Sequence, residues 1–242
     1  MKMRFVIVLV LLISVFSPKS IYAAPASEKV LAENWQVFNT ENSDLPSSKV
    51  WDIAVDQNGN KWIATQNGLA MYNDSTWTII NTSTSEIAGD FVTEIAINGN
   101  DIWIGTWNNG LSKFDGDKWT VYNQDNSGLP GRGVIFMAFD SQNTMWIGTI
   151  YSGLASFDGE SWQTYQSSNS GLPYNETADI EIRSDNSRWV STYGGGLAFW
   201  DNEEWTVFDQ TNSPLADNSV SDIEFDRHGN LWIATYGGLG CI

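Results

Sequence analysis

One short apolar motif recurs five times in this chain, and this recurrence constrains the fold more than any other feature. The motif consists of Trp, then Ile or Val, a small residue and Thr, and Gly-Leu follows within a few residues. Successive copies lie 41, 43, 43 and 43 residues apart, and they begin at Trp62, Trp103, Trp146, Trp189 and Trp232. A repeat of this period is typical of propellers and solenoids, in which each unit buries its apolar face against its neighbours.

Each repeat contains four short apolar segments, which we name A to D in chain order. They are rich in β-branched and aromatic residues, and no segment keeps a helical period. The links within a repeat have hairpin length and contain Gly, Asn and Asp, which favour tight turns. A second tryptophan series opens the D segments at Trp35, Trp77, Trp119, Trp162 and Trp205. The sequence therefore predicts repeated four-stranded antiparallel units.

Such units predict an all-β chain that forms a five-bladed β-propeller. A single D segment, Trp35–Phe38, precedes the first complete repeat, whereas the last repeat ends at Ile242 without a D segment. We therefore expect the N-terminal strand to close the last blade. The predicted divisions are a signal peptide at 1–24, a short linker at 25–34 and a propeller of about five repeats at 35–242. A truncated piece of a longer array is the alternative.

The long D–A link and the strands after it resemble the two-component regulator propeller repeat. The link reads Asn-Ser-Gly-Leu-Pro at 126–130 and 169–173, and the later part reads Asp-x-x-Gly-Asn-Leu-Trp-Ile-Ala-Thr at 226–235. The resemblance extends over essentially all of 35–242. It implies an extracytoplasmic sensor or binding region of a bacterial regulator, with a signalling partner protein and, in some members, glycan recognition.

The N-terminus has the pattern of a cleavable secretory signal peptide. Lys2 and Arg4 precede an apolar run from Phe5 to Phe16, and small residues follow at 23–26. The run is too short to anchor the chain across a bilayer. We therefore expect a periplasmic or secreted protein that does not span the membrane after the leader is removed.

The composition excludes some classes of partner. The chain has 29 acidic and 12 basic residues, a net charge of −17, and removal of the leader makes the net charge −20. A field of this sign repels nucleic acid and anionic membrane surfaces, so neither is an expected partner. The single cysteine, Cys241, cannot form an internal disulfide, so packing alone must hold the fold.

Residues that depart from the repeat are the candidates for function. Trp51 and Trp107 are the two tryptophans without a counterpart in the repeat, and they map to the strand A start and to the B–C link. In a propeller these positions share one face. Rings with small polar neighbours suit the apolar face of a sugar, or a peptide, although they could instead cap the channel against water. The predicted ligand-binding residues are Trp51, Gln66, Trp107, Tyr151, Tyr193 and Tyr236.

The third position of strand A carries a carboxylate in four repeats. These residues are Asp52, Glu94, Asp179 and Asp222. Such a set could hold a hard cation, could do acid–base work in a glycosidase or lyase, or could accept hydrogen bonds within its own blade. We favour the structural role, and we predict no catalytic residue, no metal and no cofactor.

Histidine chemistry has little support. The only histidine, His228, falls in an A–B turn, on the face opposite the aromatic residues, where it cannot serve them as a base. The sequence thus favours an exported binding or sensing module for a carbohydrate or peptide. An enzyme that uses the axial carboxylates, or a truncated sensor region, is the alternative.

Overall fold

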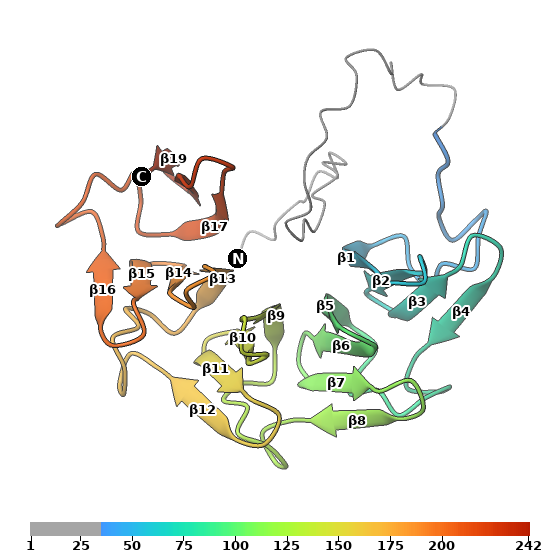
Figure 1. The fold of residues 1–242 in the computed structure, drawn as a ribbon. Coiled ribbons are helices and arrows are strands. Elements are labelled where there is room, and N and C mark those ends of the chain that lie inside the picture. Colours follow the sequence, from blue (N-terminus) through green and yellow to red (C-terminus); the bar gives the residue numbers. More distant parts are fainter. Residues whose placement is uncertain (1–34) are drawn as a thin grey trace. The chain divides into compact units, whose positions relative to one another are not determined.

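The computed structural model describes residues 35–242, so the predicted signal peptide and linker lie outside the described residues. The chain divides into two units, Met1–Val37 and Phe38–Ile242, and every sheet belongs to the second. The described residues form strands and turns without a helix, which confirms the all-β prediction (Figure 1). Within 35–242 no helix is present that could cross a membrane.

The second unit contains five sheets, and the chain runs through each one from its first strand to its last. The first strands are β1 (Val50–Val55), β5 (Val92–Asn98), β9 (Val134–Phe139), β13 (Thr177–Ile182) and β17 (Val220–Phe225). The second strands are β2 (Lys61–Thr65), β6 (Asp101–Thr106), β10 (Met145–Thr149), β14 (Arg188–Thr192) and β18 (Leu231–Thr235). The third strands are β3 (Gly68–Tyr72), β7 (Leu111–Phe114), β11 (Gly153–Phe157), β15 (Gly196–Trp200) and β19 (Gly238–Cys241). The fourth strands are β4 (Trp77–Ile80), β8 (Trp119–Tyr122), β12 (Trp162–Tyr165) and β16 (Trp205–Phe208).

All strand pairs within the sheets are antiparallel, and consecutive sheets contact one another through their first strands. The apolar cores lie between consecutive sheets, because the alternating side chains of each strand face the sheets on either side. The tryptophans of the first series are central to these cores: Trp62, Trp103, Trp146 and Trp189 are 5–9% exposed. These four tryptophans therefore pack between neighbouring sheets.

Four of the five third strands begin with a glycine, and in β7 a glycine directly precedes the strand. Gly153 has φ of 86°, and a Cβ atom there would lie 2.3 Å from the carbonyl oxygen of Tyr165 on the adjacent strand. A side chain is therefore excluded by both the backbone angle and the space. The Gly-Leu of the repeat thus marks the close approach of the third and fourth strands.

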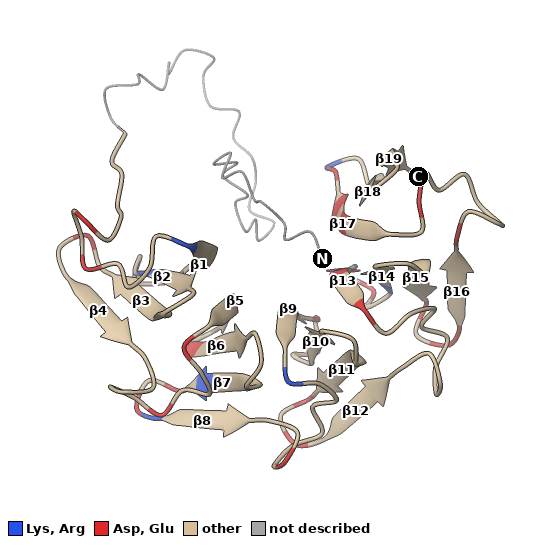
Figure 2. Ribbon diagram, turned by 180° about the vertical axis from the view of Figure 1, so that it is seen from behind, with Lys and Arg blue, Asp and Glu red and all other residues tan. Residues whose placement is uncertain are grey.

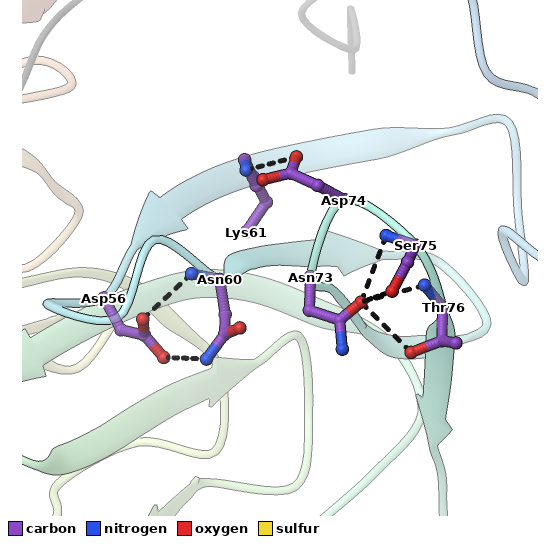
Figure 3. Close-up of polar contacts among 7 residues, drawn as sticks. All are labelled: Asp56, Asn60, Lys61, Asn73, Asp74, Ser75 and Thr76. Carbon is purple, nitrogen blue, oxygen red and sulfur yellow. Dashed lines mark hydrogen bonds and ion pairs between the residues drawn. The ribbon is translucent and has the colours of Figure 1, made fainter.

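The hairpin turns are stabilised by local hydrogen bonds to Asx side chains (Figure 3). In the first sheet, Asp56 accepts bonds from the backbone N–H groups of Asn58 and Asn60 and from the indole Nε1 of Trp62. Asn73 does the same for the backbone N–H groups of Ser75 and Thr76 in the next turn. These turns lie at the opposite ends of the strands from the B–C links. We call the side of the sheets that carries them the turn face, and the predicted site lies on the opposite face.

The last sheet differs from the others. It has three strands, β17, β18 and β19, and residues Trp35–Phe38 form no strand in the structure. Trp232 is 42% exposed and Leu239 is 66% exposed, although their counterparts in the other sheets are buried. The five repeated sheets agree with the predicted propeller blades, but the predicted closing strand is not formed within the described residues.

Candidate functional site

A β-bulge occurs at the same place in every sheet, between the first and third residues of the first strand. The second residue of each first strand is the extra one, so its side chain is turned out of the regular alternation. Trp51 is this residue in β1. The counterparts in the other sheets are Thr93, Ile135, Ala178 and Ser221. The bulge therefore explains how a large ring can lie at the end of a first strand.

The B–C links hold four of the predicted ligand-binding residues at one equivalent backbone position. In each sheet the first residue of the link donates its N–H to the carbonyl of the residue just before the first strand, at 2.8–3.2 Å. The five donors are Gln66, Trp107, Ile150, Tyr193 and Tyr236. The same backbone geometry thus presents four different types of side chain over the five sheets. Tyr151 follows Ile150 with φ of 61°, which directs its ring outward, and it is 68% exposed.

The structure brings the predicted aromatic residues into two groups. Trp51 and Trp107 have ring centroids 6.3 Å apart, and the rings of Tyr193 and Tyr236 are 6.0 Å apart. Trp107 is 44% exposed and Tyr236 is 67% exposed, whereas Trp51 is partly buried against the core between the first two sheets. The indole N–H of Trp51 is buried without a hydrogen-bond partner among the described residues. Gln66 and Tyr151 belong to neither group.

Two further aromatic residues lie at this face and were missed from the sequence. Phe91 stacks on Trp107 at 5.5 Å and 15°, and it contacts Trp51 at 5.1 Å. Tyr174 is 46% exposed and packs over Gly194 and Gly195. Phe91 directly precedes β5, where the other sheets have Lys49, Gly133, Glu176 and Ser219. Its departure from the repeat was therefore a signal that could have identified it.

The carboxylates at the third position of the first strands link consecutive sheets. Asp52 accepts the backbone N–H of Ile95 at 2.8 Å, and Asp179 accepts that of Ile223 at 3.1 Å. Glu94 accepts the backbone N–H of Met137. The predicted hydrogen bonds within the own blade are therefore only part of the pattern, because the same carboxylates also accept bonds from the next sheet. Bonds to the own strand also occur, from Ile53 to Asp52 and from Ile180 to Asp179.

Burial raises the pKa of these carboxyl groups. It raises the pKa of Asp52, and it raises that of Glu94 well above the ordinary value, with the charge of Asp52 adding to the effect. The pKa of Asp179 is also well raised, by burial and by a hydrogen bond to Asp222. Next to this pair, burial and the charges of Glu224 and Asp222 raise the pKa of Glu181 to about 7. No cluster of metal-ligating side chains was found within residues 35–242.

Acidic residues are spread over the strands and turns, with few basic residues among them (Figure 2). Two cavities were found between neighbouring links or turns. One, of about 300 Å³, lies on the turn face and is lined by Trp62, Ile102, Phe114 and polar turn residues. The other, of about 180 Å³, lies beside Trp107 and is lined by Asn108, Asn109, Asn123, Gln124, Asp125 and Arg132. His228 lies in a turn between β17 and β18 and is exposed.

Comparison with known proteins shows what this fold resembles. The extracellular domain of the putative hybrid two-component system BT3049 from B. thetaiotaomicron matches with a TM-score of 0.69 and 22% identity, over 79% of this chain and 27% of that one. Virginiamycin B lyase from Staphylococcus aureus matches with a TM-score of 0.62 and 17% identity, over 81% of this chain and 67% of that one. YCF48, solved with the D1 peptide, matches with a TM-score of 0.56 and 15% identity, over 80% of this chain and 62% of that one.

These likenesses concern the fold, because the identities are low. The chain spans about a quarter of the BT3049 extracellular domain, 27%. None of the curated proteins compared by sequence matches this chain. Residues 214–237 match the family described as "Two component regulator propeller", and this segment holds the last copy of the link, turn and Trp motif. This match confirms the resemblance to the two-component regulator propeller repeat for residues 214–237.

Proposed function

We propose that the chain is an extracytoplasmic binding module that recognises a carbohydrate through the face formed by its B–C links and first-strand bulges. The observation that carries this proposal is the group of Trp51, Phe91 and Trp107. Trp107 is stacked on Phe91 and still 44% exposed, so its ring is fixed in place and presents apolar area to solvent. A signalling partner, as the repeat family implies, belongs to the same proposal.

The chemistry of this face suits a sugar. A pyranose ring has one apolar face, which stacks on an aromatic ring, and a rim of hydroxyl groups, which need donors and acceptors nearby. Around Trp107 the polar groups are the amides of Asn108 and Asn109, and Tyr193 and Tyr236 supply phenol groups across the same set of links. Gln66 and Tyr151 occupy the corresponding links of their own sheets and complete the proposed set.

The alternative of an enzyme built on the first-strand carboxylates has less support. Asp52, Glu94 and Asp179 are largely buried and accept backbone hydrogen bonds from the next sheet, so their oxygens are already engaged in sheet packing. A peptide is the second ligand class, since an exposed ring also suits a peptide side chain. The two classes are separated by experiment rather than by geometry.

The test is binding of the intact chain to a panel of oligosaccharides and peptides, followed by calorimetry on any hit. Trp107→Ala is expected to weaken carbohydrate binding at least about tenfold, which is about 1.4 kcal/mol. His228→Ala, on the turn face, is the matched control and should leave affinity unchanged. Binding of peptides alone, or carbohydrate affinity that survives Trp107→Ala, would contradict the proposal.

We further propose that Trp35–Phe38 forms the fourth strand of the last sheet. Phe38 contacts the rings of Tyr72 and Trp77 at 5.3 and 5.4 Å. Tyr122 makes the same two contacts with Phe157 and Trp162, and it does so as the last residue of a fourth strand. Phe38 thus already has the environment of a fourth-strand residue that belongs to a preceding sheet.

The last sheet lacks the fourth strand that the other sheets have. In three sheets the buried tryptophan of the second strand contacts the last residue of its own fourth strand, as Trp146 contacts Tyr165 at 5.3 Å. Trp232 has no such neighbour among the described residues and is 42% exposed. A fourth strand from Trp35–Phe38, in the register of the other sheets, pairs Gln36 with Cys241, as Gln163 pairs with Ser156.

This register is tested with a disulfide. Paired antiparallel residues have Cα atoms about 4.5–5.5 Å apart, which suits a disulfide. Gln36→Cys is expected to form an intramolecular bond with Cys241 under mild oxidation, read by intact mass and a non-reducing gel. Val37→Cys is the control, because the side chain of residue 37 points to the opposite face of the strand from that of residue 36. This variant should not form a disulfide with Cys241. Equal cross-linking of both variants, a purely intermolecular product or no cross-link would overturn the closure.

A further inference from the structure

Arg132 departs from a hydrogen-bond pattern that the other D–A links share. In four of the five links, the side chain two residues before the first strand accepts the backbone N–H of the second residue of the link. The acceptors are Ser48, Asp90, Asn175 and Asn218, and they lie 2.7–3.3 Å from the nitrogens of Thr40, Thr82, Ser167 and Gln210. Arg132 has this position in the fifth link and has no acceptor atom. The structure of the link therefore does not explain an arginine there.

The guanidinium of Arg132 donates a hydrogen bond but forms no ion pair within residues 35–242. Its Nε donates to Oε1 of Gln124 at 3.3 Å, and Gln124 Nε2 in turn donates to the carbonyl of Pro130 at 2.7 Å. Among the ion pairs of residues 35–242, none includes Arg132. The two terminal nitrogens are thus left to face solvent in a protein whose net charge is −17.

Arg132 lies next to the exposed tryptophan of the proposed face. The backbone N–H of Gly110, at the end of the link that begins with Trp107, donates to the carbonyl of Arg132 at 2.7 Å. Between the two links is the cavity of about 180 Å³, which the Arg132 side chain lines together with Asn108, Asn109, Asn123, Gln124 and Asp125. Trp107, the other departure from the repeat, begins one of these two links, so both departures lie in neighbouring links on one face.

We propose that this cavity binds an acidic sugar, a hexuronate unit of a glycan, whose carboxylate pairs with Arg132, while the glycan as a whole is held by the face that carries Trp107. The guanidinium offers two parallel N–H groups, a geometry that matches a carboxylate. The amides can donate to and accept from the hydroxyl groups of the same sugar, and the Asp125 carboxylate can accept from them. The inference rests on the proposed carbohydrate-binding function and names the class of sugar.

The charge of the protein limits the kind of acidic ligand. The net charge of −17 opposes a densely sulfated or phosphorylated chain, whose many charges would feel the field of the whole molecule. At about 0.15 M salt the Debye length is about 8 Å, so one carboxylate beside Arg132 is governed mainly by that arginine. A glycan with a single carboxylate per sugar therefore fits better than a polyanion.

The experiment compares uronic-acid oligosaccharides with their methyl esters, which keep the shape and remove the charge. The probes are trigalacturonate and trimannuronate, each with its ester, measured by calorimetry on the intact chain at about 0.15 M salt. The wild type is expected to bind at least one acid form about tenfold more tightly than its ester. Arg132→Gln should abolish this preference, and Arg132→Lys should retain part of it.

The control is Lys49→Gln, which removes the same charge from the corresponding region of another D–A link and should leave the preference intact. Thermal melting checks that each variant is folded. Equal affinity of the wild type for acid and ester, or a preference that survives Arg132→Gln, overturns the acidic-sugar inference. If Trp107→Ala still removes binding in that case, the carbohydrate function stands. If no carbohydrate binds at all, both proposals are wrong.

Discussion

The substitution Leu239→Ala measures whether the last sheet is covered. In the other four sheets the second residue of the Gly-Leu pair is buried: Leu69, Leu111 and Leu154 are 0% exposed and Leu197 is 1% exposed. Leu239 is 66% exposed in the described residues. If Trp35–Phe38 closes the sheet, Leu239 pairs with Phe38 as Leu154 pairs with Tyr165 and becomes buried to a similar extent.

The expected cost follows from this burial. Truncation of a buried leucine to alanine costs about 3 kcal/mol, the sum of lost transfer free energy and the cavity left behind. For a domain of this size, each kcal/mol lowers the melting temperature by about 2–4 °C, so Leu239→Ala should lower it by about 6–12 °C. Leu154→Ala, at a site that the structure already shows as buried, is the reference and should cost about the same.

The assay is urea unfolding followed by tryptophan fluorescence, with thermal melting by circular dichroism as a second probe. Coincident transitions by the two probes are needed, because repeat proteins can unfold in parts. A cost within about 0.5 kcal/mol for Leu239→Ala, beside a large cost for Leu154→Ala, is what an exposed side chain gives. That result would refute closure by the N-terminal strand.

Three further substitutions test other parts of the reasoning. The pKa of Glu181 is about 7 in the folded state, above the ordinary 4.5, so the protonated side chain stabilises the fold. This contribution to the free energy of unfolding is complete below about pH 4.5 and is lost as the pH rises through 7. Glu181→Gln should therefore flatten the decline in the free energy of unfolding between pH 5 and 8, measured by urea unfolding. Gly153→Ala, with a Cβ 2.3 Å from a carbonyl oxygen, should cost more than about 1 kcal/mol in unfolding free energy, and clearly more than Gly116→Ala, which has the same sign of φ but no atom within 4 Å. Asp56→Ala leaves the buried indole N–H of Trp62 and two backbone N–H groups without their acceptor and should cost about 1–3 kcal/mol, read by thermal melting.

The architecture could be predicted from the sequence because the repeat supplies five copies of each signal. The predicted four-stranded antiparallel units are present in four of the five sheets. A periodic set of Trp, Gly and Asx residues fixes strand length, turn position and buried face at once. The repeat also placed the B–C link residues at one equivalent position, which the shared backbone hydrogen bonds confirm.

What could not be predicted depends on contacts between repeats. The bulge at Trp51 arises from strand pairing, and no residue type marks it in the sequence. The bond from Ile95 to Asp52 joins two sheets, so the pattern within one repeat revealed the bond from Ile53 but not this one. Whether the site residues bind a ligand is untested by the structure, and they stay a prediction.

The repeat also offers a way to separate stability from binding in this chain. A residue that recurs in every sheet, such as Trp146 or Leu154, is held by contacts that the other sheets reproduce, so its loss should lower stability first. Trp107 and Arg132 have no counterparts, and the backbone hydrogen bonds around them are formed by main-chain atoms that substitution leaves in place. Replacement of Arg132 should therefore alter ligand affinity while the melting temperature stays within about 2 °C of the wild type, since exposed substitutions cost about 0.5 kcal/mol or less. Trp107→Ala also removes the ring contacts with Phe91 and Trp51, so it should cost about 0.5–1.5 kcal/mol more in addition to its effect on affinity. A large loss of stability in either variant would mean that the departure serves the fold, and the reasoning that assigns it to a ligand would then fail.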